Sequence, residues 1–184
     1  MSRIDFHKPK QEVIDISNAK ITASNLQEAK ITCLKEEKDI YLYYFLHRYP
    51  GRTIVFTNSI DCLRRLSSLL TLLEFPAYPL HAKMQQRARL KNLERFRSKT
   101  HSVLIASDVA ARGLDIPAVD HVVHYQLPFD SESYVHRSGR TARASAEGLT
   151  LLLVGPEDRG SFSRLLRSLN KGTQARHISI GNQS

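Results

Sequence analysis

The sequence has little cysteine and no long hydrophobic run. Cys33 and Cys62 are its only cysteines, and they form no C-x-x-C pattern. This argues against a disulfide scaffold and a zinc site, and it fits a reducing, intracellular compartment. No apolar run approaches the roughly 18 residues of a membrane-spanning helix, and the first ten residues lack the apolar core of a signal peptide. We therefore expect no membrane partner.

Acidic residues are scarce relative to basic ones. The chain has 27 lysines and arginines against 18 aspartates and glutamates, a formal net charge of +9. Such an excess favours a polyanionic partner, most often nucleic acid; a basic protein without such a ligand is the alternative. Hydrophobic residues make up 41% of the 184 residues, which is enough for one domain with a buried core.

Strand-like and helical segments alternate along the chain. Apolar or β-branched runs are followed by segments whose apolar residues recur every three or four positions. The predicted strands are residues 28–35, 52–59, 77–82, 102–108, 121–128 and 149–156, and the predicted helices are residues 37–49, 61–74, 85–98 and 157–172. This alternation predicts an α/β fold with a mostly parallel sheet and helices on both faces.

The domain boundaries follow from the same pattern. Residues 1–27 are polar with weak periodicity and are interpreted as a linker or N-terminal extension. Residues 28–172 form the predicted domain, and residues 173–184 the predicted flexible tail. In open α/β sheets ligands bind beyond the carboxyl ends of the strands. The polar residues found there are Thr57, Asn58, Ser59, His81, Ser107, Asp108 and Gln126.

The stretch "SDVAARGLDIP" (107–117) follows a buried strand. Ser107 and Arg112 could hold a phosphodiester backbone, Gly113 allows close backbone approach, and Asp115 could accept hydrogen bonds from a ribose. The alternative is an ordinary strand-to-helix loop, in which an aspartate caps the helix and the arginine forms an ion pair.

Two further stretches are candidates for anion contacts. In "QQRARL", Gln86 and Arg89 lie one helical turn apart and share a face, although such a pair is usually just the solvated face. In "YVHRSGRTAR" (134–143), Arg137, Arg140 and Arg143 occur with no acidic neighbour. Guanidinium groups match phosphate geometry and keep their charge; pairing with distant carboxylates is the alternative.

His121 and His124 resemble a metal-binding pair only superficially. Residues i and i+3 of a strand point to opposite faces of the sheet. We interpret both histidines as structural, and we predict no metal ligands in this chain.

Taken in order, these stretches resemble the C-terminal RecA-like domain of a DEAD-box RNA helicase. "TIVFTNS" is similar to motif IV, "HAKMQQRARL" to the H-G-D-M-x-Q-x-x-R segment, "LIASDVAARGLDIP" to motif V and "YVHRSGRTAR" to motif VI. The strand "DHVVHYQLP" is similar to the family's Y-D-x-P strand. The resemblance covers about residues 28–170.

The resemblance implies roles for individual residues on the nucleotide side. Arg140 and Arg143 would reach the γ-phosphate of ATP, with Arg143 as the arginine finger. Gly113 and Asp115 would lie near the ribose and phosphates. His136 and Arg137 would couple this domain to the N-terminal RecA-like domain of the same protein.

The resemblance also implies an RNA groove. Its expected RNA-contacting residues are Thr57, Asn58, Gln86, Arg89, Ser107 and Arg112. Within the family, "HRSGRTARA" and "GPED" resemble the branch that contains DEAD-box protein twenty-four, which implies a nuclear or nucleolar protein in ribosome biogenesis. We expect a monomer.

The chain departs from the family pattern at a few positions. Ala82 and Lys83 replace the usual Gly-Asp, Gln126 replaces Asp, and Ala142 replaces Gly. None of these changes removes an expected phosphate ligand. Gln126, however, puts in doubt any interdomain contact that needs a carboxylate.

The sequence contains no G-x-x-x-x-G-K-[ST] loop and no D-E-A-D tetrapeptide. The phosphate cradle and the magnesium ligands of ATP-Mg²⁺ are therefore expected from the N-terminal domain. The sequence predicts the C-terminal half of an ATP-dependent RNA helicase, inactive alone, that couples ATP hydrolysis to remodelling of RNA duplexes or ribonucleoproteins. A stand-alone RNA-binding module and a basic scaffold that binds only proteins are the alternatives.

Overall fold

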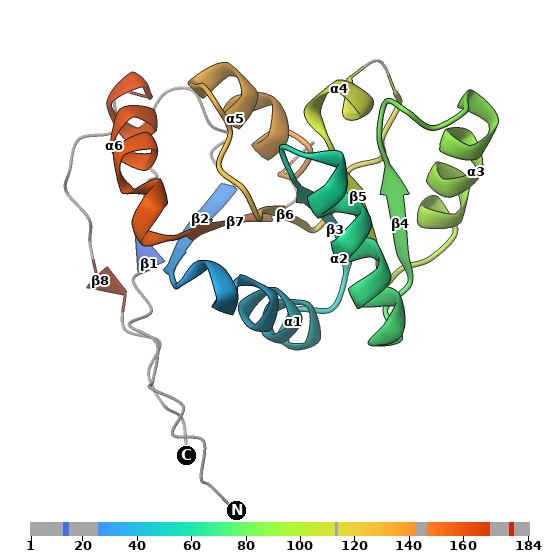
Figure 1. Ribbon diagram of the computed structural model, residues 1–184, viewed down its shortest axis with the longest axis horizontal. Helices are drawn as coiled ribbons and strands as arrows, with labels where there is room; N and C mark the ends of the chain where they lie inside the picture. Colours follow the sequence, from blue (N-terminus) through green and yellow to red (C-terminus); the bar gives the residue numbers. More distant parts are fainter. Residues whose placement is uncertain (1–12, 15–25, 113, 143–146, 170–176, 179–184) are drawn as a thin grey trace, which may run out of the picture.

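The computed structural model describes residues 13–14, 26–112, 114–142, 147–169 and 177–178. At its centre lies a six-stranded sheet with the order β2-β7-β6-β3-β5-β4, in which every neighbouring pair is parallel (Figure 1). The strands are β2 (Leu26–Thr32), β3 (Arg52–Phe56), β4 (Ala77–Leu80), β5 (Ser102–Ala106), β6 (His121–His124) and β7 (Gly148–Val154). A separate antiparallel pair joins β1 (Val13–Ile14) to β8 (His177–Ile178).

Helices cover both faces of the sheet, as predicted. In Figure 1, α1 lies below the sheet, and α4, α5 and α6 lie above it. The buried residues of α1 and α2 share one core, and those of α3 and α4 share another. The helices are α1 (Lys38–Arg48), α2 (Ile60–Leu72), α3 (Gln86–Arg97), α4 (Asp108–Ala111), α5 (Ser131–Ser138) and α6 (Arg159–Ser168). Short 3-10 turns, η1 (Lys35–Glu37) and η2 (Pro156–Asp158), precede α1 and α6.

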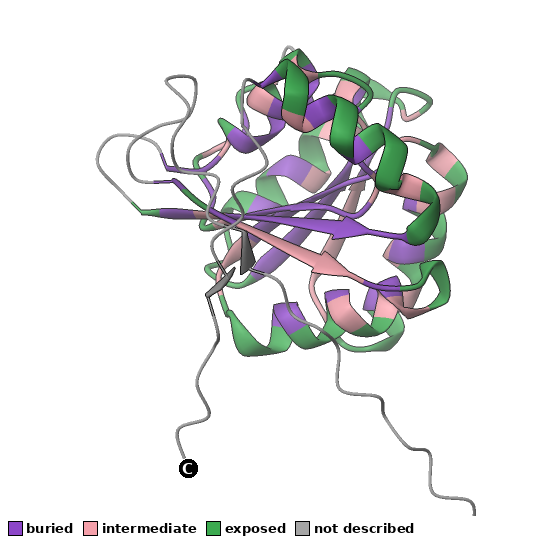
Figure 2. Cartoon of the chain, turned by 90° about the vertical axis from the view of Figure 1, so that its left-hand side faces the viewer, coloured by how far each residue is buried: buried purple, intermediate pink, exposed green. Residues whose placement is uncertain are grey.

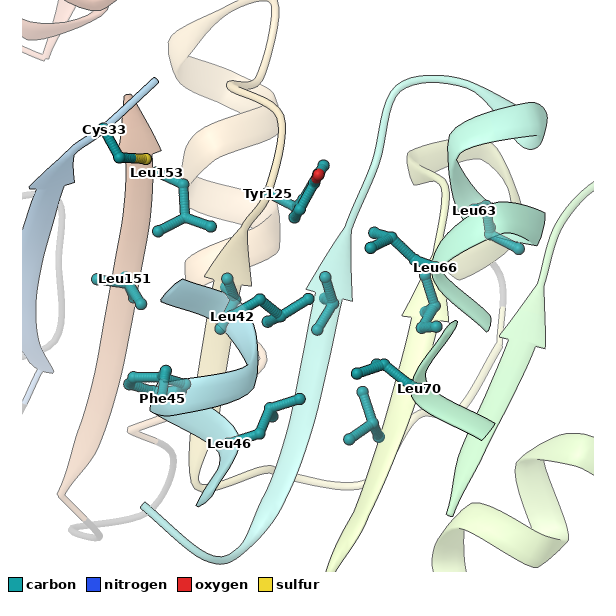
Figure 3. Packing of buried hydrophobic residues seen from close by; sticks show 14 residues of the cluster. Cys33, Leu42, Phe45, Leu46, Leu63, Leu66, Leu70, Tyr125, Leu151 and Leu153 are labelled. Carbon is teal, nitrogen blue, oxygen red and sulfur yellow. The ribbon is translucent and has the colours of Figure 1, made fainter. Parts of the chain in front are cut away.

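Alternating residues of the central strands build separate cores on the two faces. Ile54 and Phe56 of β3 pack with Leu93 and Phe96 of α3 on one face. Val55 joins the core under α1 and α2 on the other face. Figure 2 shows the strands as a mostly buried layer between exposed helix surfaces, and Figure 3 shows Leu42, Phe45, Leu46, Leu63, Leu66 and Leu70 facing the sheet. Each such side chain contributes about 1.5–3 kcal/mol on burial.

The site lies in the loops after the strands, and there the sequence predictions need correction. The predicted strands 52–59 and 121–128 end at Phe56 and His124, so the polar residues that follow form loops. Helices α4 and α5 were not predicted at all. The eight-residue α5 buries polar Ser133, Arg137 and Ser138, so it carries no apolar periodicity. The feature of the sequence that marks the start of α5 is its N-cap residue, Asp130. The Asp130 carboxylate accepts a hydrogen bond from the Ser133 backbone N–H at 2.7 Å.

The predicted domain limits stay a prediction. The main sheet begins with Leu26, inside the stretch interpreted as a linker. Most of residues 1–27 and 173–184 lie outside the described residues.

Candidate functional site

The loops that carry the candidate residues lie side by side along one edge of the sheet. The last residues of four strands are in register, with Leu80 opposite Ala106, Ala106 opposite Phe56, and Phe56 opposite His124. The loops that follow β4, β5, β3 and β6 therefore leave the sheet at the same level. This edge is where open α/β sheets bind their ligands.

Arg137 of α5 lies at the centre of this edge, and it is 1% exposed. Its Nε and Nη2 donate to the two carboxylate oxygens of Asp108, both at 2.7 Å. Nη1 donates to the carbonyl oxygen of Gln126 at 2.8 Å, and Nη2 also donates to Oδ1 of Asn58 at 2.7 Å. The guanidinium stacks 5.1 Å from the ring centroid of Phe56. One side chain thus joins the loops after β3, β5 and β6.

The expected role of Arg137 in coupling this domain to the N-terminal RecA-like domain stays a prediction. A buried guanidinium with a two-point carboxylate partner and two further acceptors has no free surface for another domain in this conformation. The alternative reading, a pairing with a distant carboxylate, applies to Arg137. Within this domain, Arg137 holds three loops together, and coupling to a partner domain would act through them in this conformation.

Asn58 and Gln126 are also satisfied inside the domain. The Asn58 backbone N–H donates to Oε1 of Gln126 at 2.7 Å, and its Nδ2 donates to the Leu127 carbonyl at 2.8 Å. An amide oxygen at residue 126 accepts this bond as a carboxylate could. Thr57 is fully buried, and its hydroxyl donates to the Ser59 carbonyl at 3.3 Å. These residues shape the loop, and the expected RNA contacts of Thr57 and Asn58 stay predictions.

Gln86 and Arg89 share one face of α3, as predicted. Nη1 of Arg89 donates to Oε1 of Gln86 at 3.2 Å, and Nη2 donates to the Ala110 carbonyl at 3.0 Å. Arg89 thereby links α3 to α4, the helix formed by the motif after β5. Gln86 is exposed and Arg89 is half-buried, so both reach the surface between the two helices.

The loop after β5 presents three further candidates. Ser107 precedes α4 and is half-buried, whereas Arg112 is exposed just after that helix. Asp115 is exposed, and Nη2 of Arg97 donates to its Oδ2 at 2.9 Å and also to its carbonyl oxygen. A surface ion pair of this kind contributes only about 0–1 kcal/mol, so Asp115 can exchange this partner for a ligand. Gly113 lies outside the described residues.

The end of α5 and the turn after it carry the remaining candidates. His136 is exposed, 4.0 Å from the Glu132 carboxylate. A small pocket brings His136 and Arg140 together with Arg112. The turn is fixed by its backbone, because the Arg140 carbonyl accepts from the Val119 N–H at 3.1 Å. Arg143 lies outside the described residues.

Ala142 shows why the family favours glycine at this turn. Its φ is +53°, a left-handed conformation that costs an alanine roughly 1 kcal/mol relative to glycine. The preceding residue, Thr141, anchors the turn because its hydroxyl donates to the Val119 carbonyl at 2.6 Å. The chain therefore keeps the turn geometry without the glycine.

A buried polar cluster supports α5 from below. His124 is fully buried, its ring stacks on Tyr134 at 5.1 Å, and its Nε2 lies 3.3 Å from Oγ of Ser138. Burial, and secondly the nearby Arg137 charge, hold the pKa of His124 well below its usual value. The Tyr134 hydroxyl donates to buried Glu28 of β2.

The structural interpretation of the two histidines agrees with their surroundings. His121 lies in the same strand as His124 and pairs with Thr53, whose Oγ1 is 3.2 Å from its Nδ1. Among the described residues, no group of three or more histidine, cysteine or acidic side chains could hold a metal ion. Nor does any helix in the described part of the chain have the length and apolar character needed to cross a membrane.

The other half of the edge holds polar networks that the sequence did not reveal. Arg65 donates to both carboxylate oxygens of Asp39, at 2.6 and 3.0 Å, and to the Tyr125 hydroxyl at 2.9 Å. Partial burial works to raise the pKa of Asp39, but the hydrogen bonds from Arg65 and Tyr125 outweigh it and lower that pKa. Nζ of Lys38, a buried lysine, pairs with Asp158 at 2.8 Å. These groups line a cavity of about 1000 Å³.

Comparison with known proteins agrees with this geometry. The family model of the helicase conserved C-terminal domain matches residues 29–145. The chain belongs to that family. The ATP-dependent RNA helicase DDX24 of Homo sapiens is 56% identical over 162 residues, which are 88% of this chain and 19% of that protein. The ATP-dependent RNA helicase mak5 of Schizosaccharomyces pombe is 46% identical over 166 residues, 90% of this chain and 25% of that protein.

Solved structures give the same assignment. The E. coli DEAD-box protein SrmB matches with a TM-score of 0.74 and 32% identity, over 81% of this chain and 89% of that one. A DEAD-box protein from Methanococcus jannaschii matches with a TM-score of 0.76 and 28% identity, over 81% of this chain and 41% of that one. The RecA-like fold and the resemblance to DEAD-box helicases are confirmed, and the relatives named DDX24 agree with the predicted branch. The chain spans only about a fifth of the curated relatives named above.

Proposed function

We propose that this domain is the C-terminal half of an ATP-dependent RNA helicase that couples ATP hydrolysis to remodelling of RNA duplexes or ribonucleoproteins. The observation that carries the proposal is the convergence of motifs IV, V and VI on one edge of the sheet. Arg137 ties their loops together through Asn58, Asp108 and Gln126. A shared network lets a change at one motif reach the others, as a motor needs.

On the nucleotide side, the residues present fit the part of ATP that a second domain contacts. Arg140 is half-buried beside exposed His136, and Arg143 follows three residues later in the sequence. We propose that Arg140 and Arg143 reach the γ-phosphate, with Arg143 as the arginine finger, and that Asp115 and Gly113 lie near the ribose. Bound ATP-Mg²⁺ supplies the reactive phosphoryl group, while the arginines offset charge that develops during transfer.

On the RNA side, we assign four residues of α3 and the loop after β5, of which Gln86 and Arg112 are exposed and Arg89 and Ser107 are half-buried. Arg89 links α3 to α4, while Arg112 lies just after α4, beside the pocket that also holds His136 and Arg140. Guanidinium, amide and hydroxyl groups contact phosphate and sugar, so this groove would bind RNA with little regard to sequence. Thr57 and Asn58 contribute by shaping the adjacent loop. His136 is the exposed residue best placed to contact the N-terminal domain.

The setting of this activity is proposed from the DDX24-type resemblance. The chain would act in ribosome biogenesis in the nucleolus, within a longer protein that also supplies the P-loop and the magnesium ligands. We propose that it works as a monomer and that the domain alone does not hydrolyse ATP.

The first test is an RNA titration of the chain joined to its N-terminal helicase domain, with and without ATP. A motor binds RNA more tightly with nucleotide, because both ligands share the cleft between two domains. A stand-alone RNA-binding module would show the same affinity in both conditions. A scaffold that binds only proteins would not bind RNA, and either result would contradict the proposal.

The second test is Arg143→Ala in the same two-domain protein. Arginine fingers contribute roughly 10³- to 10⁵-fold in rate, so RNA-stimulated ATP hydrolysis should be lost while the melting temperature stays unchanged. Arg143→Lys should restore little, because an ammonium keeps the charge but loses the two-point geometry. Hydrolysis by Arg143→Ala within about threefold of the parent rate, at saturating RNA and ATP, would rule out the assigned role and make Arg140 the next candidate.

A further inference from the structure

The carboxyl end of the edge strand β4 carries two basic residues that the groove described above does not use. Lys83 lies in the turn between β4 and α3, three residues before Gln86, and Arg64 lies one turn into α2. Both side chains are exposed. α2 packs against β4, so Arg64 projects beside the same strand end.

Arg64 and Lys83 both influence the buried His81. It is the first residue after β4, and it is only 6% exposed. Burial first, and then the charges of Arg64 and Lys83, lower the pKa of His81. Lys83 follows His81 by two residues, and Arg64 belongs to the helix that packs against β4, which agrees with an influence of both charges on this imidazole. Nδ1 of His81 has no hydrogen-bond partner in the described part of the chain.

Arg64 and Lys83 differ from the cations that the domain pairs internally. Arg137 pairs with Asp108, Arg97 with Asp115, and Lys38 with Asp158. Within residues 26–112, 114–142 and 147–169, no carboxylate forms an ion pair with Arg64 or Lys83. Two exposed charges of the same sign at one strand end, neither of them in an ion pair with a described carboxylate, are available to an anionic ligand.

We propose that Arg64 and Lys83 form an additional RNA-phosphate contact, which extends the strand's path from Gln86 across the end of β4 towards α2. The inference rests on the proposed RNA groove and deepens it. Lys83 stands where the family pattern has an aspartate, so this chain differs by two charge units at the edge of the groove. An extended contact of this kind would lengthen the RNA segment that the domain holds.

Ammonium and guanidinium groups that contact phosphate leave a measurable signature. Each contact to a single strand releases counter-ions and adds about 0.7 to the slope of log affinity against log salt. Such contacts read no bases, so the gain should be the same for different sequences. It should also require an RNA long enough to reach from Gln86 to the far side of β4.

The experiment is a titration of labelled single-stranded oligouridine into the 184-residue chain between about 50 and 200 mM salt. Lys83→Ala and Arg64→Ala should each lower the slope by about 0.7, and the double variant by about 1.4. Lys83→Asp should weaken binding more than Lys83→Ala. Lys99→Ala, which removes an exposed charge before β5 at the opposite edge of the sheet, should leave the slope near the parent value.

A series of shorter oligouridines separates a local contact from a general effect of net charge. The difference between parent and double variant should disappear once the RNA no longer reaches β4. A difference that persists at every length, or a double variant with the parent slope, would overturn the proposal. If Arg112→Ala lowers the slope while the double variant does not, the extension is wrong and the groove stands. If none of these variants changes the slope, both fail.

Discussion

The two halves of the sheet's carboxyl edge use the same kinds of charged side chain in opposite ways. Beyond β6 and β7, Arg65 pairs with Asp39, and Lys38 pairs with Asp158. Beyond β4 and β5, Lys83 and Arg112 are exposed and form no ion pair with the described residues. The first half pairs Lys38 and Arg65 internally, whereas Lys83 and Arg112 in the second half remain available to a partner.

This difference shows that the number of charged side chains does not tell which of them are free of ion pairs and can bind a partner. A net charge of +9 suggests a polyanion, but it does not say which face binds it. Arg137 lies between the two halves, and it is buried and paired although it belongs to the motif whose arginines were expected to contact phosphate. Pairing, rather than residue type, therefore separates structural cations from ligand-binding ones.

The largest loss of stability should come from removing Arg137, which lies between the two halves. Arg137→Ala leaves Asp108 without its buried partner, and such losses cost about 3–5 kcal/mol. Denaturant unfolding should show this loss, whereas Arg112→Ala should stay within about 0.5 kcal/mol of the parent. A loss below about 1 kcal/mol for Arg137→Ala would mean that the network behaves like a surface ion pair.

The second effect concerns pH and the cluster beneath α5. The pKa of His124 is lowered on folding from 6.5. As the pH falls, His124 therefore binds a proton in the unfolded chain before it does so in the folded chain. The contribution of neutral His124 to stability is complete above pH 6.5 and falls below it, by about 1.4 kcal/mol per pH unit. His124→Phe should flatten this slope between pH 6.5 and 5, with exposed His101→Gln as control. An unchanged slope would exclude His124 as its source.

A smaller effect is expected on the paired half of the edge. The Arg65 side chain is 51% exposed, so solvent screens its pair with Asp39. Arg65→Ala should cost about 0.5–1 kcal/mol, as measured by thermal or denaturant unfolding. Tyr125→Phe, which keeps the Arg65–Asp39 pair, is the matched control and should cost less. If Arg65→Ala lost as much stability as Arg137→Ala, the exposed Arg65–Asp39 pair would contribute as much as the buried Arg137–Asp108 pair.

Much of the fold could be predicted because the sheet is buried on both faces. Every residue of β5 is buried, so its apolar run predicted a central strand directly. α2 also followed its leucine spacing, because Leu63, Leu66 and Leu70 recur every three or four positions and are all buried. Apolar periodicity could not reveal α4 and α5, because the former is a single turn and the latter buries polar groups.

The site was predictable in its position but not in its bonding. The rule that ligands bind beyond parallel strands placed Asn58, Ser107 and Gln126 at one edge. It could not show that Asn58 and Gln126 bond to each other, or that Arg137 is buried, since those contacts join residues about 70 to 80 positions apart. The Asp39–Arg65 pair gave no signal either, because neither residue belongs to a recognisable motif.

The most direct test compares two arginine deletions that change the net charge equally. Arg112→Ala removes an exposed arginine from the unpaired half, and Arg65→Ala removes a paired arginine from the other half. We expect Arg112→Ala to lower the salt slope of single-stranded RNA binding by about 0.7, while Arg65→Ala keeps the parent slope and affinity. If both variants lower the slope equally, RNA responds only to net charge, and the division of the edge into structural and RNA-binding halves is wrong.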